Sequence, residues 1–386
     1  MKVNIGVVGR FHAFDLAKQL NKKNILNKLI TTYPKFKARE WGLKNDRIVS
    51  ELFLEILNRH RNKIPLIKNE IINKFVKIQH AKKCSKYLTQ CDIHIGWSSS
   101  TLETIIEAKK QKKIVILERG SSHYTYQMNI LEEENKKHGN SKFQANYSQW
   151  QRELLEYELA DYISIPSSFV KRTFIEQGVD ESKLLLNPYG VDLQEFKQVE
   201  KADDVFRIIF AGGGSLRKGY HYLLQAFYEL DLPNCELWHL GSINDEVKPF
   251  LEKYKHKNWI LKGHKPQNEL YKYYSQGSIF VLPSLEEGFA MVQFQAMACG
   301  LPLICTTNTG GEDLITKNGE EGFVIPIRNV EAIKEKILYL YNNQNICKDM
   351  GQKAKKKIEK GFSWDDYGNR YIKNLEKIMP NATKNK

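Results

Sequence analysis

Residues 287–300, EGFAMVQFQAMACG, lie between two apolar runs, Ile279–Leu282 and Leu301–Cys305. An acid and a glycine, Glu287 and Gly288, open this stretch, and small and apolar residues follow. The order predicts a buried strand, a tight turn and a helix. In an open parallel sheet, ligands bind outside the carboxyl ends of the strands, where helix amides point. The stretch therefore places a carboxylate and a flexible backbone at a ligand-binding edge.

Strand-like and helix-like segments alternate along most of the chain. The expected strands are Val3–Val8, Ile93–Gly96, Ile114–Leu117, Tyr162–Ile165, Phe206–Ala211, Glu236–Leu240, Trp259–Leu261, Ile279–Leu282, Pro302–Cys305 and Gly322–Ile325. The expected helices are Ala13–Leu20, Leu102–Lys110, Leu154–Ala160, Tyr222–Leu230, Glu269–Tyr274, Phe289–Cys299 and Val330–Tyr341. Such alternation is typical of right-handed βαβ crossovers and parallel sheets, so we predict the α/β class.

The length of 386 residues favours two domains. Pro and Gly in the segment NPYG at 187–190 mark the boundary. We therefore predict a first domain over residues 1–188 and a second over residues 189–365. A C-terminal helix over about residues 366–386 is expected to pack back onto the first domain.

Composition indicates a protein of the cytoplasm. No segment approaches the ~20 consecutive apolar residues of a membrane span, and the start, MKVNIGVVGRF, lacks the features of a signal peptide. The six cysteines form no Cys-x-x-Cys pair, which favours free thiols over structural zinc.

The formal net charge is +14, and basic residues are densest from Arg59 to Lys86, where nine basic residues accompany one acid. Such a patch suits an anionic surface: membrane lipid, a polyphosphate carrier or nucleic acid. The alternative is a solvated surface of a lysine-rich chain. Nucleic acid is not the expected partner, because the chain has no recognised nucleic-acid-binding module. A peripheral position on the inner membrane leaflet is compatible with the patch.

Residues 206–219, FRIIFAGGGSLRKG, form a second pattern of strand, glycine loop and helix start. Gly213 and Gly214 let backbone amides approach a phosphate closely. Arg217 can bind phosphate oxygens with two parallel hydrogen bonds, and Lys218 adds a point charge, so the loop suits a diphosphate. The alternative is an ordinary loop with incidental basic residues. The pattern is not a Walker loop.

The stretch at 287–300 complements this loop. Glu287 can accept hydrogen bonds from two sugar hydroxyls, while Gly288 and Phe289 offer amides. Gln295, two helical turns on, can accept a hydroxyl hydrogen bond without charge. Gly310, in the loop NTGGE at 308–312, closes the same pocket from a neighbouring strand. In the alternative interpretation Glu287 only complements a helix dipole, and Gln295 is an ordinary helix-surface residue.

These motifs resemble a retaining glycosyltransferase of family four, with the GT-B fold of glycosyl transferases group 1. The matching segments are RKG at 217–219, PSLEEGF at 283–289 and AMACGLP at 296–302. The resemblance extends from about Ala160 to Trp364. It departs from the family pattern at Gln295, where members carry a second Glu that holds the donor ribose, and at Gly213, where many carry a basic residue.

The resemblance implies two Rossmann-like domains with parallel sheets facing across a cleft. It implies a metal-independent, retaining hexosyltransferase without a cofactor, which moves a sugar from a UDP- or GDP-sugar to a cell-surface glycan, such as lipopolysaccharide or another polysaccharide, or to a lipid-linked acceptor. The implied donor-binding residues are Gly213, Gly214, Arg217, Lys218, Glu287, Gly288, Phe289, Ala290, Gln295 and Gly310. The implied catalytic residues are His123, Glu287, Arg217 and Lys218.

The first half resembles the family only in layout. A loop with Gly9 and Arg10 ends the first strand, and ERGSSH at 118–123 follows the strand Ile114–Leu117. The expected acceptor-side residues are Gly9, Arg10, Arg119, Ser122 and His123. In the alternative, His123 caps the next helix or lies on the surface. His12 and His94 are weaker candidates for a histidine in the cleft.

Two other functions stay open at this point. Gln295 is compatible with a non-catalytic protein that binds a nucleotide sugar within a glycan-assembly complex. The basic segment is compatible with a peripheral protein whose main partner is a membrane or a nucleic acid. The second of these does not exclude sugar transfer.

Overall fold

Two parallel sheets organise the protein, as the computed structural model shows for residues 1–63, 67–140 and 146–379. The first sheet has seven strands in the order β3-β2-β1-β4-β5-β6-β7. These strands are β1 (Val3–Val7), β2 (Leu26–Thr31), β3 (Ile48–Ser50), β4 (Ile93–Trp97), β5 (Ile114–Glu118), β6 (Tyr162–Ile165) and β7 (Leu184–Leu186). The second sheet has six strands in the order β10-β9-β8-β11-β12-β13. They are β8 (Phe206–Ala211), β9 (Cys235–Leu240), β10 (Trp259–Leu261), β11 (Ile279–Leu282), β12 (Leu303–Thr306) and β13 (Gly322–Ile325).

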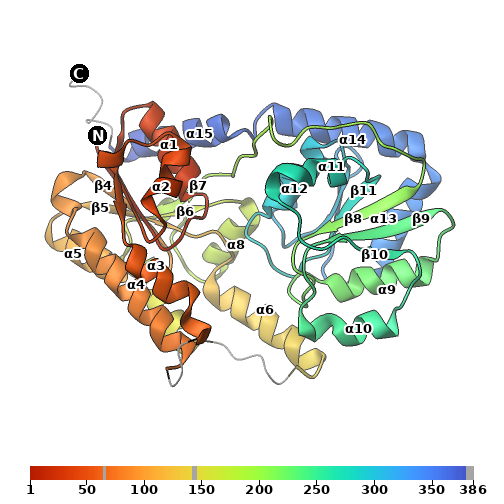
Figure 1. Ribbon diagram of the computed structural model, residues 1–386, viewed down its shortest axis with the longest axis horizontal. Coiled ribbons are helices and arrows are strands. Elements are labelled where there is room, and N and C mark those ends of the chain that lie inside the picture. The colour runs from red at the N-terminus through yellow and green to blue at the C-terminus, as the bar shows by residue number, and fades with distance from the viewer. Residues whose placement is uncertain (64–66, 141–145, 380–386) are drawn as a thin grey trace.

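Helices cover both faces of each sheet (Figure 1). Those of the first half are α1 (Ala13–Lys22), α2 (Lys35–Ala38), α3 (Leu52–Arg59), α4 (Asn69–Ser85), α5 (Leu102–Lys110), α6 (Tyr124–Lys137), α7 (Tyr147–Leu159) and α8 (Ser168–Glu176). Those of the second half are α9 (Tyr220–Leu230), α10 (Lys248–Lys253), α11 (Leu270–Tyr274), α12 (Met291–Ala298), α13 (Val330–Asn342), α14 (Gln344–Glu359) and α15 (Trp364–Ile378). The predicted α/β class is confirmed.

The burial of the strands explains why their positions could be predicted from apolar runs in the sequence. Every residue of β1, β4, β8, β11 and β12 is buried, as expected for parallel strands that have helices on both faces. Strands β6, β8, β10, β11 and β13 have the predicted limits. Strands β2, β3 and β7 and helices α2, α3, α4, α6, α8, α10 and α14 were not assigned from the sequence. Strands β3 and β7 have only three residues each, and charged residues interrupt the apolar residues of the other elements.

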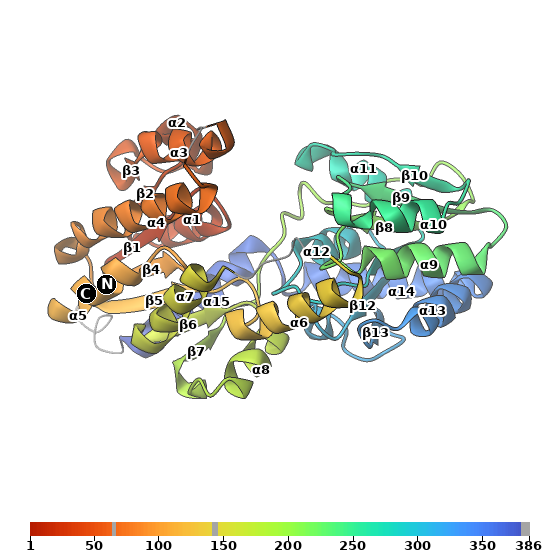
Figure 2. The ribbon, with the colours of Figure 1, turned by 90° about the horizontal axis from the view of Figure 1, so that it is seen from below.

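The chain passes twice between the two lobes (Figure 2). The two passes lie side by side: the amide of Val191 donates to the carbonyl of Phe362 at 2.8 Å, and Val191 forms a parallel bridge with Ser363. A Cβ on Gly190 would lie 2.6 Å from backbone atoms of Ser363, so only glycine fits there. The two interdomain connections are therefore joined to each other by backbone contacts.

After the second pass, the C-terminal helix α15 lies on the first domain, alongside α1 (Figure 1). Ser363 and Asp366 cap it reciprocally, and Gly368 lets it approach closely, since a Cβ there would lie 2.6 Å from the side chain of Gln19. Residues 380–386 of the predicted C-terminal helix lie outside the described residues.

Candidate active site

Two loops of the second domain meet where β8 and β11 end. The segment after β8 turns at Gly219, which has a φ of 60° and begins α9. A Cβ on Gly219 would lie 1.9 Å from the carbonyl oxygen of Pro283, which follows β11. Glycine is thus required sterically and conformationally, and this contact brings Arg217 and Lys218 to the segment that carries Glu287.

Ion pairs join the two loops. The Nζ of Lys218 lies 2.5 Å from Oε1 of Glu287, and a guanidinium nitrogen of Arg217 lies 3.7 Å from the other oxygen. Arg217 also donates from Nε to Glu286 at 2.9 Å. Glu287 and Glu286 raise the pKa of Arg217, which stays charged. The structure thus brings together three residues that the sequence assigned to one pocket.

Unpaired amides adjoin this charge cluster. In the part of the chain that the structure describes, the backbone amides of Gly288, Phe289 and Ala290 donate no hydrogen bond, although all three residues are buried. They directly precede α12, whose N-terminus carries the positive end of the helix dipole. Because buried amides are nearly always paired in native proteins, these three mark a place for an acceptor-rich ligand.

The predicted glycines divide into two kinds. A Cβ on Gly213 would meet nothing closer than 3.7 Å, and this residue is half-buried. Gly214 is packed: its backbone bridges to Ile243, and a Cβ would lie 2.8 Å from His239. Gly213 is therefore free to face a ligand, while Gly214 holds the loop against β9.

Gln295 and Gly310 lie beside the same segment but have protein partners. The side-chain oxygen of Gln295 accepts from the hydroxyl of Tyr274 at 3.1 Å, inside the domain. Gly310 has a φ of 72°, and a Cβ there would lie 2.7 Å from the ring of Phe289. Phe289 itself is buried, 4.5 Å from the ring of Phe294. The contacts of Gln295 and Gly310 thus lie within the protein, beside the segment that follows β11.

Glu286 is a site residue that the sequence did not single out. It is fully buried and reaches into the first domain, where it accepts from the amide and hydroxyl of Ser122 at 3.0 and 2.8 Å and from Gln127 at 2.8 Å. Burial alone would raise its pKa, but Arg217 and these hydrogen bonds hold the pKa below its usual value. Two acids in succession after a buried strand were the only signal, because neighbouring side chains point in different directions.

Gly288 also contacts the first domain. A Cβ there would lie 1.8 Å from the carbonyl oxygen of Gly120, and the carbonyl of Gly288 accepts from Ser167 at 2.5 Å. The glycine that follows Glu287 therefore serves a close approach of the two domains.

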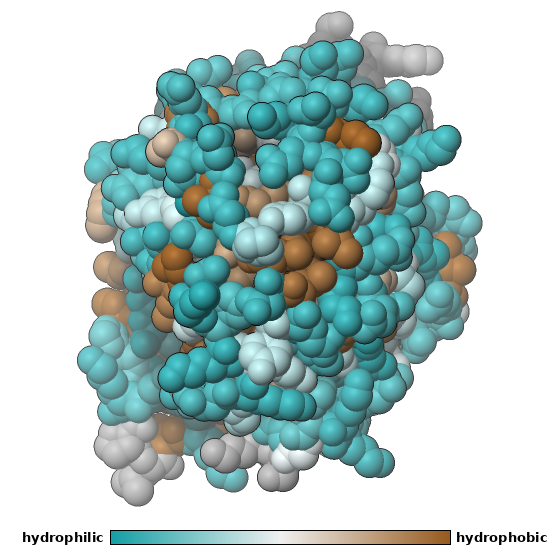
Figure 3. All heavy atoms as spheres, turned by 90° about the vertical axis from the view of Figure 1, so that its right-hand side faces the viewer, coloured by the Kyte–Doolittle hydropathy of each residue, from teal (hydrophilic) through white to brown (hydrophobic). Residues whose placement is uncertain are grey.

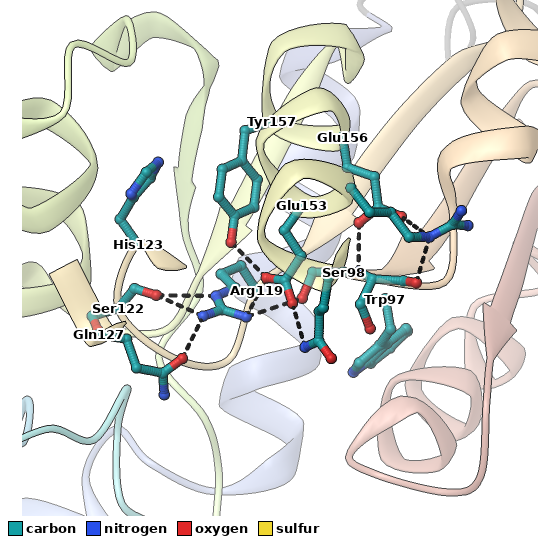
Figure 4. A network of polar contacts seen from close by, with 12 residues as sticks. Trp97, Ser98, Arg119, Ser122, His123, Gln127, Glu153, Glu156 and Tyr157 are labelled. Atoms are coloured by element: carbon teal, nitrogen blue, oxygen red, sulfur yellow. Dashed lines mark hydrogen bonds and ion pairs between the residues drawn. The ribbon is translucent and has the colours of Figure 1, made fainter. Parts of the chain in front are cut away.

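The structure corrects the expectation for His123 (Figure 4). Its ring packs 5.0 Å from both Tyr157 and Phe174, and Nδ1 accepts from the amide of Thr125 at the start of α6. Burial first, and Arg119 second, lower its pKa to about 4. The side chain is therefore a buried helix cap packed against aromatic rings, as in the alternative interpretation.

Arg119 and Ser122 are likewise used inside the protein rather than toward an acceptor. Arg119 pairs with Glu153 at 2.6 Å and donates to the carbonyl of Ser122 and to Gln127 (Figure 4). Ser122 is fully buried on Glu286. The expectation that these two side chains face an acceptor is wrong, since buried charges and hydroxyls take the nearest partners.

The loop after β1 is more open. Arg10 is exposed, with its guanidinium 5.3 Å from the ring of Trp41, and Gly9 has a φ of 83°. Of the weaker candidates, His94 is buried inside the sheet, and burial lowers its pKa to about 3. His12 lies 3.2 Å from Glu118, at the carboxyl ends of β1 and β5. Among these histidines, His12 is the one beside the edge where the domains meet.

Other parts of the surface do not join this site. A cavity of about 580 Å³ lies at the amino ends of β8, β11 and β12, and none of the predicted site residues lines it. The end of the second domain that faces away from the first is mainly hydrophilic, with hydrophobic atoms gathered near its middle (Figure 3). None of the described helices has the length and apolar character of a membrane span.

Comparison with known proteins supports the assignment of the second domain. Residues 192–357 match the family described as Glycosyl transferases group 1. An uncharacterized glycosyltransferase of Methanocaldococcus jannaschii is 33% identical over 41% of this chain and 44% of its own length. The capsular polysaccharide biosynthesis glycosyltransferase CapM of Staphylococcus aureus is 28% identical over 55% of this chain and 61% of its own. The matches thus span about half the length of these curated relatives.

Solved structures share the fold over nearly the whole chain. Sucrose-phosphate synthase of Thermosynechococcus elongatus has a TM-score of 0.74 and 16% identity, over 98% of this chain and 99% of its own. HepE of Anabaena, solved with UDP-glucose, has a TM-score of 0.71 and 13% identity, over 98% of this chain and 100% of its own. These likenesses show the two-domain GT-B fold.

Proposed function

The chain is a GT-B protein with a Glycosyl transferases group 1 domain, and we propose that it is a retaining glycosyltransferase for a UDP- or GDP-sugar. The observation that carries this proposal is the Lys218–Glu287 pair, 2.5 Å apart, beside three unpaired amides. A pyrophosphate and a sugar hydroxyl complement these groups: cations and amides bind phosphate oxygens, and a carboxylate accepts from hydroxyls.

Donor binding is proposed to redistribute the ion pairs. Lys218 and Arg217 would turn from Glu287 to the diphosphate, and the carboxylate of Glu287 would then be free for the sugar. In the transfer step the leaving diphosphate takes the acceptor's proton, while the two cations offset the charge that develops on it. No metal ion or cofactor has a part in this scheme.

The acceptor is proposed to be a cell-surface glycan or a lipid-linked saccharide. The name of the Staphylococcus aureus relative, a glycosyltransferase of capsular polysaccharide biosynthesis, supports this class. The UDP-glucose bound by HepE supports a UDP-sugar as the first donor to test.

The test measures release of nucleoside diphosphate from a panel of UDP- and GDP-sugars in the presence of cell-extract acceptors, and the shift in melting temperature on adding each donor alone. Lys218→Ala and Glu287→Ala should lose most of the release, whereas Lys255→Ala, which removes an exposed lysine of the same domain, should not. Release that is the same in all four proteins would refute the site.

Gln295 favours a second candidate, a nucleotide-sugar-binding protein without turnover. Its amide oxygen is occupied by Tyr274 and carries no charge, so a ribose hydroxyl would be held about half as strongly as by a carboxylate. Gln295→Glu separates the two cases. A large gain in release indicates a weakened enzyme, and tight donor binding without release in both proteins favours the second candidate.

We also propose that α3 and α4 dock on an anionic membrane. Phe53 and Ile71 are 71% and 59% exposed on these neighbouring helices, and Lys68, Lys74 and Lys82 are exposed along α4 or next to it. Apolar side chains that can enter the headgroup region, with lysines around them, are typical of an interfacial surface.

Vesicle flotation tests the docking. Binding to phosphatidylcholine vesicles should appear only with phosphatidylglycerol present, should weaken in salt, and should be lost in Phe53→Ser/Ile71→Ser and in Lys68→Gln/Lys74→Gln/Lys82→Gln. The control is Lys253→Gln/Lys255→Gln/Lys257→Gln, a triple change of exposed lysines on the second domain. Equal loss in the control, or no binding by the wild type, refutes membrane docking.

A further inference from the structure

Helix α6 of the first domain reaches the second domain (Figures 1 and 2). One acid and two histidines lie together there. Glu134 lies in the last turns of α6 and is fully buried. His138 follows the same helix as its C-terminal cap, and His221 lies in the first turn of α9. Oε1 of Glu134 lies 2.9 Å from Nε2 of His221 and 3.1 Å from Nε2 of His138.

The sequence makes this arrangement from two elements. Glu134 and His138 are four residues apart, so one helix face presents both. His221 approaches from the other domain, with its ring 4.8 Å from that of His138, edge to face. One potential ligand atom from each of the three residues lies within 4.8 Å of the others.

As a set of hydrogen bonds, the cluster is overfilled. The same Oε1 of Glu134 also accepts from the hydroxyl of Tyr222 at 2.8 Å, so three groups crowd one oxygen that has two lone pairs. Among the described residues, the buried Nδ1 of His221 has no hydrogen-bond partner. A cation between the carboxylate oxygen and the two ring nitrogens would relieve this crowding.

We propose that Glu134, His138 and His221 bind a transition-metal ion, Zn²⁺ by preference, that joins the two domains. Two imidazole nitrogens with one carboxylate are a usual ligand set for Zn²⁺ and not for Mg²⁺ or Ca²⁺. Tetrahedral Zn²⁺ with bonds of about 2.0–2.1 Å sets its ligand atoms about 3.3 Å apart, close to the distances from Glu134. The side chain of His138 is 18% exposed, so water can reach the fourth position.

The neighbouring charges fit this site. Arg328 donates to the other oxygen of Glu134 at 2.7 Å and also pairs with Glu133 at 3.0 Å, so two carboxylates share its charge. Lys137 is held 3.0 Å from the hydroxyl of Tyr222. Contacts of this kind orient a ligating carboxylate from outside the metal. The six cysteines are free and buried and take no part.

The proposed ion is structural and separate from sugar transfer. His221 lies in the first turn of α9, so the metal would fix the start of this helix against α6. None of the three proposed ligands is among the proposed donor-binding residues. Because the binding test uses metal alone, it does not depend on the proposed activity.

The experiment is a calorimetric titration with ZnCl₂ of chelator-treated full-length protein that carries no polyhistidine tag. The wild type should bind one equivalent, show a rise in melting temperature with Zn²⁺, and give the visible spectrum of four-coordinate Co²⁺. His138→Ala and His221→Ala should each weaken binding at least about tenfold and lose both signals. His264→Ala, which removes an exposed histidine of the second domain, should match the wild type.

Circular dichroism without metal checks the fold of each variant. His138→Ala is the decisive one, because this residue lies at the rim and its removal leaves the contacts of Glu134 with Arg328 and Tyr222. The proposal is overturned if the wild type binds no stoichiometric Zn²⁺, or if folded His138→Ala binds Zn²⁺ as tightly as the wild type.

Discussion

The loops at the carboxyl ends of the two sheets contain similar residues but use them in opposite ways. After β8 and β11, Lys218, Arg217 and Glu287 pair across a space that unpaired amides adjoin. After β5, the side chains of Arg119 and Ser122 are paired with other buried residues of the protein. The second domain thus keeps polar groups available for a ligand. In the first domain the corresponding groups make contacts within that domain, as Arg119 does, or with the other domain, as Ser122 does.

A chain of contacts connects the two edges. Glu153 pairs with Arg119, Arg119 donates to Gln127, Gln127 donates to Glu286, and Glu286 pairs with Arg217. The buried pair of the first domain therefore supports the position of an arginine that we propose binds the donor. Substitutions can therefore test the stabilising role of the loop after β5 separately from the binding role of the loops after β8 and β11.

The largest effect is expected from Arg119→Met, which leaves Glu153 buried without its cation. Removing one partner of a buried pair costs about 3–5 kcal/mol of unfolding free energy, to be measured by urea denaturation. Arg10→Met, on the exposed loop of the same domain, should leave that free energy unchanged. Equal stability of the two variants would mean that the first-domain edge is not structural.

Lys218→Ala should act on binding rather than on stability. Loss of one cation that faces the developing charge should lower nucleoside diphosphate release about 100-fold, or about 2.7 kcal/mol. The urea midpoint should change little, because Lys218 is partly exposed. A variant that unfolds easily but releases diphosphate normally would reverse the roles assigned to the two edges.

Glu286→Gln tests the connection between the edges. The amide can keep one hydrogen bond from Ser122 but loses the charge that faces Arg217, so a decrease of about 1–3 kcal/mol in transition-state stabilisation is expected. Glu286 has a lowered pKa, so its contribution to stability is present above the ordinary carboxyl pKa and is lost on acidification. The wild type should therefore lose more unfolding free energy than Glu286→Gln as the pH falls below the ordinary carboxyl pKa. Parallel plots of unfolding free energy against pH for the two proteins would contradict this.

The smallest effect is expected from His123→Asn, since asparagine can also cap α6. Diphosphate release near neutral pH should stay within about threefold of the wild type, that is, within roughly 0.7 kcal/mol. The folded-state pKa of about 4 lies below the ordinary value of 6.5, so the wild type loses stability as the pH falls from 6.5 to 4. His123→Asn should show a shallower loss over this window, and a collapse of release at neutral pH would restore a catalytic role for His123.

The binding edge could be predicted from sequence because its signals are local. A buried strand, glycines, a basic pair and a helix start follow one another within residues 206–219, and strand ends converge in a parallel sheet. The roles of Arg119 and His123 depend instead on Glu153, Tyr157 and Phe174, which are distant in sequence. Local pattern gave the layout of the first domain but could not say which polar side chains remain free. The role of Glu286 could not be predicted for the same reason, because Ser122 and Gln127, which donate to it, belong to the other domain.

The backbone contacts between the two interdomain connections restrict how the lobes can move relative to each other. Because Val191 is hydrogen-bonded to Phe362 and Gly190 lies against Ser363, the two connections cannot slide past each other independently. An opening of the lobes would therefore occur more easily as a rotation about this pair of connections than as a sideways shear. Displacement grows with distance from the axis, so contacts remote from it are the first to separate when the lobes part.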